Sequence, residues 1–275
     1  MAKGSLEQSK IGFIGCGAMA RALAGGLIEA GVEASQIVAS DPFAGARDQF
    51  EEAIGTKPGE DNDQVVAQAD VIVLAVKPNA VASVLEDLDA ALAAQPLWIS
   101  IAAGVPLDKL ASALPSDARI VRTMPNTPAL VGAGATAYFP SASVSDADIQ
   151  LTEAILEAAG WCWRAPNEGL LDAVTGLSGS GPAYVFLILE ALADAGVRQG
   201  LPRDAAQSLA TRTVLGAAKL ALETGTHPGQ LKDQVTSPGG TTIAGLEQLE
   251  AHGVRAAIYD AVRAATERSK ALRDD

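Results

Sequence analysis

The sequence predicts two domains: an α/β N-terminal domain with a doubly wound parallel sheet, and an all-α C-terminal domain. Over the first 165 or so residues, short apolar runs of strand length alternate with helical patterns, as in a parallel sheet that helices cover on both faces. A glycine-rich turn joins the first of these runs to the first helix. After about Asn167, no strand-like alternation remains and long apolar helical patterns follow. The domain boundary is therefore expected near residues 165–168.

In the N-terminal domain, KIGFIG (residues 10–15) and VIVLAV (residues 71–76) are continuous apolar runs. Such runs are typical of strands that are buried on both faces. Strands are expected over residues 10–15, 36–40, 71–76, 97–101 and 119–123, and helices over residues 18–30, about 80–94 and 106–114.

In the C-terminal domain, prolines mark the starts of helices, because the first helical turn tolerates a residue without an N–H donor. Pro182 and Pro202 each precede a long apolar pattern. Helices are expected over residues 184–196, 202–222, 243–250 and 254–272. These helices are apolar enough to need a partner surface.

The composition excludes several classes of function. Among 275 residues, 33 Asp and Glu against 20 Lys and Arg give a net charge of −13, which disfavours general binding to nucleic acid or to an anionic membrane. The only cysteines and histidines are Cys16, Cys162, His227 and His252. They form no motif with metal-ligand spacing, so no metal centre is expected.

Two observations predict a soluble, cytoplasmic protein without a membrane partner. The N-terminus is polar and does not resemble a signal peptide. The most hydrophobic later segment, residues 183–196, is interrupted by Glu190 and Asp194 and falls short of the ~20 apolar residues that a membrane helix needs.

The first segment with chemical meaning is the glycine turn GCGAMA (residues 15–20), between the first strand and the first helix. Gly15 permits the tight turn, Gly17 lets the backbone approach a pyrophosphate, and Ala20 lets the helix pack closely on the strand. The helix N-terminus offers N–H groups and a positive dipole end to phosphates. In this position the pattern predicts dinucleotide binding rather than a purely structural turn.

The end of the second strand leaves the choice between NADH and NADPH open. Asp41 lies 21 residues after Ala20, where an acid commonly hydrogen-bonds the adenosine ribose hydroxyls and favours NADH. Ser40 could equally hold a 2′-phosphate, with Arg47 as a counter-charge. Asp41 and the proline after it could also simply start a turn.

Three further segments follow strands: AVKP (residues 75–78), AAG (residues 102–104) and MPNTP (residues 124–128). Ligands in an open α/β sheet bind beyond the carboxyl ends of the strands, so Lys77 is expected at the crevice. Small side chains at residues 102–104 would let the backbone approach a nicotinamide ribose. The two prolines of residues 124–128 make a stiff loop that suits a site wall or an ordinary loop equally.

The Ser/Gly loop TSPGGTT (residues 236–242) precedes a helix and has no apolar content, so packing does not explain it. The N–H groups of residues 240–242 and the hydroxyls of Ser237 and Thr241 could hold a carboxylate. The alternative is an elaborate helix cap. A similar Gly/Ser turn, residues 178–184, is expected to serve close packing at the domain junction.

No general base stands out, although oxidation of a hydroxyacid needs one. His227 lies near a helix start and His252 near a helix end, so capping or solvated roles suit them better. A cyclic imine is readily protonated on nitrogen and needs no such base. The protein would only have to align the nicotinamide with the imine carbon and hold a carboxylate.

Together these residues resemble the pyrroline-5-carboxylate reductase family over essentially the whole chain. Residues 228–250, which include LKDQVTSPGGTTIAGLEQLE, are similar to the family's signature position by position. DAVTGLSGSGPAY (residues 172–184), residues 76–78 and residues 124–128 are also typical. The resemblance implies reduction of the small molecule 1-pyrroline-5-carboxylate to L-proline, the last step of proline biosynthesis, with NADPH or alternatively NADH.

The resemblance also implies an architecture. It assigns residues 1–165 to a dinucleotide-binding Rossmann domain and residues 166–275 to a helical substrate-binding and dimerisation domain. The family's helical domain forms an interlocked homodimer, and in some members these dimers assemble further into a decamer.

Carried over residue by residue, the resemblance implies specific contacts. Cofactor contacts fall on Ile14, Gly15, Cys16, Gly17, Ala18, Met19, Ser40, Asn62, Ala75, Val76, Lys77, Pro78, Ala102, Ala103 and Gly104. Substrate contacts fall on Glu168, Ser237, Gly240, Thr241 and Thr242. Thr242 is the catalytic residue, expected to hydrogen-bond the ring nitrogen.

The chain departs from the family's pattern in the glycine turn and before the Ser/Gly loop. Cys16 and Ala18 replace an alanine-like residue and an asparagine, and Gln234 stands where some members carry asparagine. Cys16 is expected to pack as a small residue, although an exposed thiol at this place would be sensitive to oxidation.

Two other classes compete with this reading. A β-hydroxyacid dehydrogenase would use Lys77 or another lysine as its base and would not require the Ser/Gly loop in this form. A non-catalytic NAD(P)-binding protein should have lost that loop, whereas here its Ser, Gly and Thr residues are all present.

Overall fold

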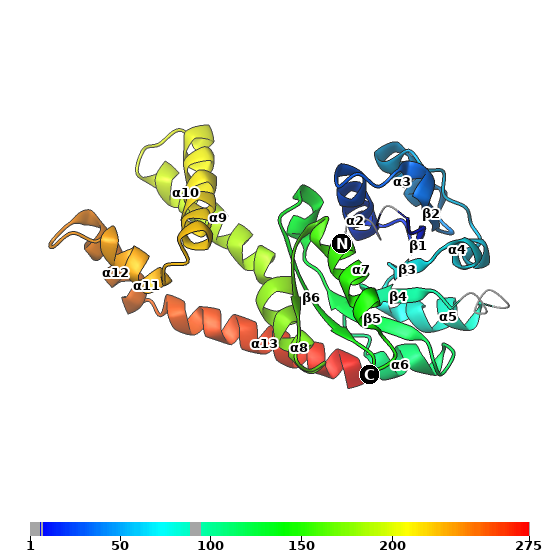
Figure 1. Ribbon diagram of the computed structural model, residues 1–275. Coiled ribbons are helices and arrows are strands. Elements are labelled where there is room, and N and C mark those ends of the chain that lie inside the picture. The colour runs from blue at the N-terminus through cyan, green and yellow to red at the C-terminus, as the bar shows by residue number, and fades with distance from the viewer. Residues whose placement is uncertain (1–5, 7, 89–94, 275) are drawn as a thin grey trace. The chain divides into compact units, whose positions relative to one another are not determined.

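The computed structural model describes residue 6, residues 8–88 and residues 95–274 (Figure 1). The chain divides into two compact units. The first comprises Met1–Ser180 together with Ala264–Asp275, and the second comprises Gly181–Arg263. Each unit is described by itself below.

The first unit contains a seven-stranded sheet in the order β2-β1-β3-β4-β5-β6-β7 (Figure 1). Its strands are β1 (Ile11–Ile14), β2 (Ile37–Ser40), β3 (Val71–Leu74), β4 (Leu97–Ser100), β5 (Arg119–Met124), β6 (Gly134–Pro140) and β7 (Gly160–Arg164). The pairs among β1 to β5 are parallel, β6 runs antiparallel to β5, and β7 runs parallel to β6. The predicted doubly wound α/β fold is confirmed, and each of the five expected strands is present within one or two residues.

Both faces of the sheet are buried in a hydrophobic core, which explains why the strands are continuous apolar runs in the sequence. Phe13 and Val73 belong to one core and Ile72 and Trp98 to the other. The first core is completed by α2 (Ala18–Glu29), α3 (Ala44–Ile54) and α7 (Asp146–Glu157), and the second by α4 (Asn62–Gln68), α5 (Val81–Glu86) and α6 (Leu107–Ser112). Part of the helix expected over residues 80–94 lies outside the described residues.

Strands β6 and β7 were not expected from the sequence. Strand β6 begins Gly-Ala-Thr-Ala, a stretch too poor in large apolar side chains to predict a buried strand. Strand β7 lies at the edge of the sheet, and its Trp161 and Trp163 are exposed. Strands β6 and β7 extend the sheet beyond β5, the last of the parallel strands β1 to β5.

The first unit continues past the expected boundary at residues 165/166. Helix α8 (Leu170–Val174) and the π-helical turn η5 (Thr175–Gly179) belong to it, as does the C-terminal end of α13 (Val254–Asp274). Leu171 of α8 is buried with Ala137 of β6 and Ala165, so α8 packs on the sheet rather than with the helices that follow. The division of function between residues 1–165 and 166–275 remains a prediction.

The second unit is helical, as predicted. It contains α9 (Gly181–Arg198), α10 (Arg203–Thr224), α11 (Pro228–Gln234), α12 (Thr241–Ala251) and the start of α13. Helix α9 continues directly from α8 and η5 as one helical stretch, Leu170–Arg198, which is long and apolar enough to cross a membrane by length and composition alone. Pro182 is the second residue of α9, in the first helical turn as expected, and α9 follows η5 without an intervening loop.

A pair of neighbouring glycines in α2 tests the packing of the first unit. A Cβ on Gly26 would lie 2.2 Å from the carbonyl oxygen of Ala158, whereas a Cβ on Gly25 would meet nothing within 4 Å. We expect Gly26→Ala to lower the free energy of unfolding by about 1–3 kcal/mol through overpacking. Gly25→Ala should raise it by about 0.5–1 kcal/mol, because alanine is the better helix former. Urea unfolding of both variants measures this, and equal effects would contradict the packing described.

Candidate functional site

The glycine turn joins the ends of three strands. Gly15 has a positive φ of 100°, and a Cβ on it would lie 2.7 Å from the carbonyl oxygen of Ala75. Its N–H donates to the carbonyl oxygen of Ser40 at 2.8 Å, and the N–H of Ala75 donates to that of Ile14 at 2.8 Å. A side chain at Gly15 would therefore force the ends of β1 and β3 apart.

Gly17 faces open space at the start of α2. Its φ of −67° suits any residue, and a Cβ on it would meet no atom within 4 Å. No side chain caps α2 at this position, so the first N–H groups of the helix lack that partner. Open space beside a helix N-terminus is what a dinucleotide pyrophosphate requires. The residues present therefore fit the cofactor.

Asp41 starts a turn, which is the alternative that the sequence left open, and it also bonds the glycine turn. Its Oδ2 accepts the N–H of Cys16 and its Oδ1 that of Phe43, both at 2.8 Å. Because both oxygens serve backbone donors and the residue is only 8% exposed, Asp41 fixes the glycine turn. Contact with a ribose hydroxyl is the lesser part of what this carboxylate can do.

Ser40 and Asn62, both expected at the cofactor, lie together. The hydroxyl of Ser40 donates to Oδ1 of Asn62 at 2.7 Å. Arg47, the expected counter-charge, donates to the carbonyl oxygen of Asp41 at 2.8 Å and pairs with Glu60 at 2.6 Å. The polar side chains expected at the adenosine end of the cofactor, Ser40, Asn62 and Arg47, are thus hydrogen-bonded to other groups of the chain.

Cys16 is buried, as expected of a small packing residue. Cys16 has no exposed surface. Burial raises the pKa of its thiol to about 12, and the negative charge of Asp41 is a smaller cause of the same increase. The thiolate is the nucleophilic form of cysteine, so Cys16 is not a reactive group of the site.

The residues after β3 and β4 border a cavity of about 690 Å³. Pro78, Ala103 and Gly104 line it, and Gly104 has a positive φ of 77°. Other lining residues come from segments that sequence reasoning did not assign to the site: Val81, Lys109, Thr175, Ser180, Arg268, Ser269 and Leu272. The last turns of α13 carry no motif, whereas Thr175 and Ser180 belong to segments that the family resemblance quoted without a role.

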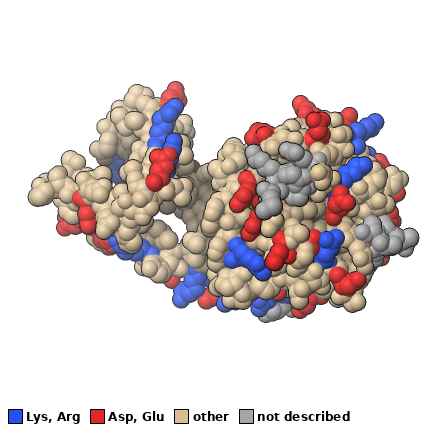
Figure 2. All heavy atoms as spheres, in the orientation of Figure 1, with Lys and Arg blue, Asp and Glu red and all other residues tan. Residues whose placement is uncertain are grey.

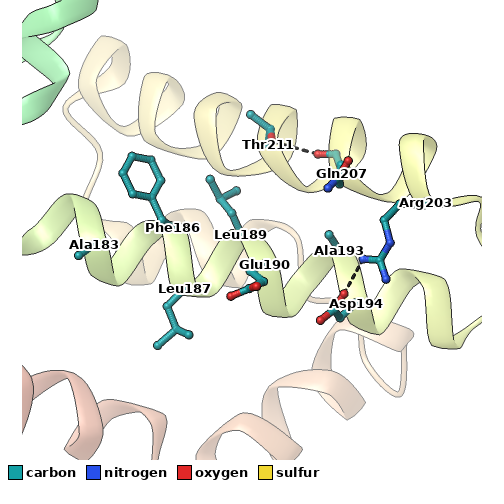
Figure 3. A pocket seen from close by; sticks show the side chains of 10 residues that line it. All are labelled: Ala183, Phe186, Leu187, Leu189, Glu190, Ala193, Asp194, Arg203, Gln207 and Thr211. Carbon is teal, nitrogen blue, oxygen red and sulfur yellow. Dashed lines mark hydrogen bonds and ion pairs between the residues drawn. The ribbon is translucent and has the colours of Figure 1, made fainter.

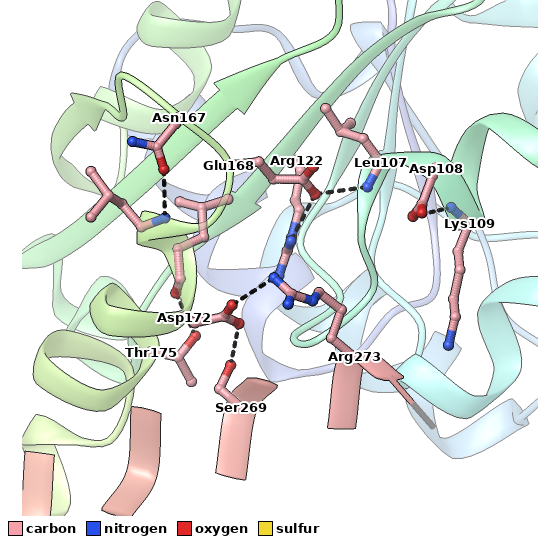
Figure 4. A network of polar contacts seen from close by, with 12 residues as sticks. Leu107, Asp108, Lys109, Arg122, Asn167, Glu168, Asp172, Thr175, Ser269 and Arg273 are labelled. Carbon is pink, nitrogen blue, oxygen red and sulfur yellow. Dashed lines mark hydrogen bonds and ion pairs between the residues drawn. The ribbon is translucent and has the colours of Figure 1, made fainter. Parts of the chain in front are cut away.

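Glu168 belongs to a network of paired charges (Figure 4). Its Oε1 accepts from Nη1 of Arg122 at 2.7 Å and from the N–H of Leu107 at 2.8 Å. The side chain of Arg122 is only 3% exposed, and a buried guanidinium needs such a partner. In the first unit, Glu168 therefore anchors Arg122 of β5 and the start of α6. Its expected contact with substrate remains a prediction.

Asp172 is the second carboxylate of this network. Its Oδ1 accepts the hydroxyl of Ser269 at 2.8 Å, and its Oδ2 pairs with Nη1 of Arg273 at 3.0 Å (Figure 4). Since the side chain of Asp172 is 1% exposed, these two contacts hold the C-terminal end of α13 against α8.

The other expected substrate residues lie in the second unit, in the Ser/Gly loop between α11 and α12. Gly239 has a positive φ of 64°, and the N–H of Gly240 donates to the carbonyl oxygen of Ser237 at 3.1 Å. The N-cap of α12 is Gly240, which makes no side-chain cap. The loop therefore leaves the first N–H groups of α12, at Thr241 and Thr242, without a side-chain cap, which favours an anion site over the cap considered as the alternative.

Both histidines serve helix ends, as expected. Nδ1 of His227 accepts the N–H of Gly229 at 3.1 Å at the start of α11. His252 follows α12, and its Nδ1 lies 2.8 Å from the carbonyl oxygen of Gln248. Neither ring has a position that indicates a general base.

The sheet, the glycine turn and the open helix start define a Rossmann-type dinucleotide-dependent oxidoreductase with a helical second part. Residues 10–104 match the family model "NADP oxidoreductase coenzyme F420-dependent", and residues 168–272 match "Pyrroline-5-carboxylate reductase dimerisation". The chain belongs to the pyrroline-5-carboxylate reductase family, as its relatives show. Members of this family are NAD(P)H-dependent oxidoreductases that catalyse the last step of proline biosynthesis.

Two curated relatives are both named pyrroline-5-carboxylate reductase. The one from Methanosarcina acetivorans is 47% identical over 97% of this chain and 99% of its own length. The one from Escherichia coli strain K12 is 46% identical over 96% of this chain and 98% of its own length. These relatives support the imine reductase over the two competing classes.

Solved structures give the same result. A pyrroline-5-carboxylate reductase from Coxiella burnetii superposes with a TM-score of 0.90 at 42% identity, over 96% of this chain and 98% of its own. The Plasmodium falciparum enzyme, solved with NADP bound, superposes with a TM-score of 0.87 at 35% identity, over 97% of this chain and 99% of its own.

The thiols provide a pH-dependent prediction. Burial is the main cause that raises the pKa of both Cys16 and Cys162 from 9.0 to about 12. At pH 8 we expect Ellman's reagent to label both thiols at least about 100-fold more slowly in the folded protein than in urea. Above pH 9 the unfolded chain loses these protons first, so the free energy of unfolding should fall as the pH rises toward 12. Rapid labelling of Cys16 in the folded protein would contradict its burial.

Proposed function

We propose that this chain performs its family's reaction with the cofactor on the carboxyl-end edge of β1 to β4 and the substrate on the Ser/Gly loop. The observation that carries the assignment to the edge is the open helix start at Gly17, next to a turn that three strand ends hold in place. The substrate is 1-pyrroline-5-carboxylate and the product is L-proline.

The cofactor-holding residues are proposed as one continuous set along that edge. The glycine turn and the start of α2 take the pyrophosphate, Ser40 and Asn62 the adenosine ribose, and residues 75–78 and 102–104 the nicotinamide half. When bound, NADPH supplies the hydride that reduces the imine carbon. The chain itself has no group suited to that redox step, so its contribution is alignment.

The substrate is proposed to bind through its carboxylate. Backbone N–H groups at Thr241 and Thr242 and the hydroxyl of Ser237 hold the carboxylate oxygens. Gly240, whose own N–H donates to the carbonyl oxygen of Ser237, lies beside them as the N-cap of α12. The hydroxyl of Thr242 hydrogen-bonds the ring nitrogen, which bears a proton when the imine carbon accepts hydride. Fixing both ends of a small rigid ring places the imine carbon for transfer. Glu168, whose carboxylate is paired with Arg122, is proposed as a further contact of the substrate.

NADPH is proposed as the preferred cofactor, with NADH as the alternative. Both oxygens of Asp41 accept backbone N–H groups, which removes much of the usual reason to favour NADH. We propose that a 2′-phosphate meets the hydroxyl of Ser40, at the end of β2, and the side chain of Asn62, at the start of α4, which are hydrogen-bonded to each other.

A homodimer is proposed from the exposed apolar surface of the second unit. Phe186 and Leu187 of α9 and Leu215 of α10 are each more than 60% exposed. Figure 2 shows large areas of this unit without charged side chains on the face in view. Exposure of this much apolar surface to water is unfavourable in free energy. The family model that matches here is a dimerisation model. For the larger assembly, we propose a decamer built of dimers.

Helices α9 and α10 also border a hollow of about 720 Å³. Figure 3 shows Phe186 and Leu187 among its lining residues, with an ion pair between Asp194 and Arg203 at one end. The apolar stretch Leu170–Arg198 is proposed to be covered by a second copy of the chain and not by lipid, because Glu190 and Asp194 lie within it. The protein is accordingly proposed to be a soluble cytoplasmic enzyme without a nucleic-acid partner.

Gly17→Trp tests the pyrophosphate site. Because no protein atom lies near a Cβ at this position, the variant should fold with wild-type circular dichroism and melting temperature. The indole would fill the space for the pyrophosphate, so NADPH titration by fluorescence should show affinity reduced at least about 100-fold. Tight NADPH binding by this variant would remove the glycine turn from the site.

Thr242→Ala tests the catalytic residue. We expect kcat to fall about 10- to 100-fold, the effect of one lost transition-state hydrogen bond or positioning contact. The matched control is Thr224→Ala, since the hydroxyl of Thr224 bonds backbone groups of Leu220 and Thr226 at the end of α10. Steady-state kinetics with pyrroline-5-carboxylate measure both variants, and an unchanged kcat for Thr242→Ala would exclude the residue from the mechanism.

A further inference from the structure

The proposed reaction leaves two sequence motifs without a role: the loop MPNTP (residues 124–128) and the turn SGSGPAY (residues 178–184). The structure brings them together through Asn126. This residue is only 9% exposed, and its side-chain amide bonds two backbone groups that lie far apart in the chain.

Both atoms of the Asn126 amide are used. Oδ1 accepts the N–H of Ala135 at 2.9 Å, and Nδ2 donates to the carbonyl oxygen of Ser178 at 3.2 Å. One partner requires an acceptor and the other a donor, so an amide satisfies both, whereas an ionised carboxylate or an aliphatic side chain does not.

The carbonyl of Ser178 needs this donor because of Pro182. Residues 170–198 form one helical stretch, in which the carbonyl of Ser178 would accept the N–H four residues later. That residue is Pro182, which has no N–H. The helix widens at the same place, since the N–H of Ser180 donates to the carbonyl oxygen of Thr175 at 2.8 Å, five residues back. Nδ2 of Asn126 occupies the place of the missing proline donor.

The turn held in this way forms a wall of the cavity at the proposed nicotinamide end. Thr175 and Ser180, its two ends, line the 690 Å³ cavity together with Ala103 and Gly104. Between them, a Cβ on Gly179 would lie 2.4 Å from Cε of Met124, so the MPNTP loop touches the turn at a second point. Single-turn π-helices of this kind are frequent at functional sites.

We propose that Asn126 is a positioning residue for imine reduction. It supplies the hydrogen bond that Pro182 cannot, and it thereby fixes η5 and the next residue, Ser180. Thr175 of η5 and Ser180 face the reacting end of the bound cofactor. The use of the cavity rests on the proposed function. The hydrogen-bond replacement does not, and it can be tested without cofactor or substrate.

Asn126→Leu removes both hydrogen bonds at similar volume. We expect kcat to fall about 10-fold, because a displaced wall misaligns the reactants. The KM for NADPH should change by less than about 2-fold, because the pyrophosphate and adenosine contacts lie at β1 and β2. Hydrogen exchange of the amides of residues 178–180 in the cofactor-free protein should be at least about 10-fold faster than in the wild type.

Asn126→Asp should disturb the fold less than Asn126→Leu, because it keeps the acceptor for the N–H of Ala135. A neutral carboxylic acid can also donate to Ser178, but a carboxylate cannot. Relative to the wild type, this variant should be active at low pH and lose kcat as the pH rises through the pKa of the new carboxyl. The matched control is Asn167→Asp, because only Oδ1 of Asn167 is used, by the N–H of Leu170 at 3.2 Å. The control should follow the wild-type pH profile.

Pro182→Ala restores the backbone donor that the sequence lacks. Combined with Asn126→Leu, it should recover at least about half of the lost logarithm of kcat and of the lost exchange protection. The replacement of the proline donor by Asn126 is overturned if the double variant is as impaired as Asn126→Leu, or if Asn126→Leu exchanges at the wild-type rate.

The positioning role is overturned if Asn126→Leu has the wild-type kcat, or if the pH profile of Asn126→Asp is identical to that of the wild type from pH 5 to 9. Failure of the wild type to reduce pyrroline-5-carboxylate would instead overturn the proposed function, and the exchange results would still decide the role of the amide.

Discussion

The structure depends on the close approach of the first strand's carboxyl end to its two neighbours. At Gly15 there is no room for a side chain beside Ala75, and backbone bonds tie the turn to Ser40 on one side and to Ala75 on the other. Asp41 adds a third tie through the N–H of Cys16. Because this turn is fixed by its own chain, the start of α2 faces open space without rearrangement. Preorganised donors of this kind are what a phosphate site requires.

A second constraint is the pairing of buried charge below that edge. Arg122 and Asp172 are each almost fully buried, and each has an opposite charge within 3.0 Å. Removing one member would leave an uncompensated charge in the interior, at a cost of about 3–5 kcal/mol. Through these pairs the segment that follows the sheet, α8, and the end of α13 are held on the first unit. The end of α13 borders the cavity next to residues 103 and 104, and so does Thr175, which directly follows α8. The charge network therefore shapes this cavity.

Much of the fold could be predicted from the sequence, because its parallel strands are continuous apolar runs and its helix starts carry proline or glycine signals. Strands β6 and β7 could not, since one begins with small residues and the other is a half-exposed edge. The position of Asp41 predicts an acid near the ribose. Which atoms it bonds depends on the path of the turn 25 residues earlier, and no local pattern contains that information.

The candidate site was predicted in the same uneven way. Motifs such as the glycine turn and the Ser/Gly loop can be recognised from their local composition. Contacts such as Asn126 with Ser178 join residues 52 apart, and only the three-dimensional structure shows that Pro182 leaves a carbonyl for an amide to satisfy. The end of α13 carries no motif at all, and its place beside the cavity follows from a single buried carboxylate on α8.

The central claim is that this chain aligns NADPH with a cyclic imine. The most direct measurement is the decay of nicotinamide absorbance with pyrroline-5-carboxylate, run in parallel with NADPH and NADH at sub-millimolar cofactor. We expect rapid oxidation of the cofactor, with proline as the product and a higher kcat/KM for NADPH. A folded protein that binds NADPH but does not oxidise it in the presence of this imine would show that the chain is not an imine reductase.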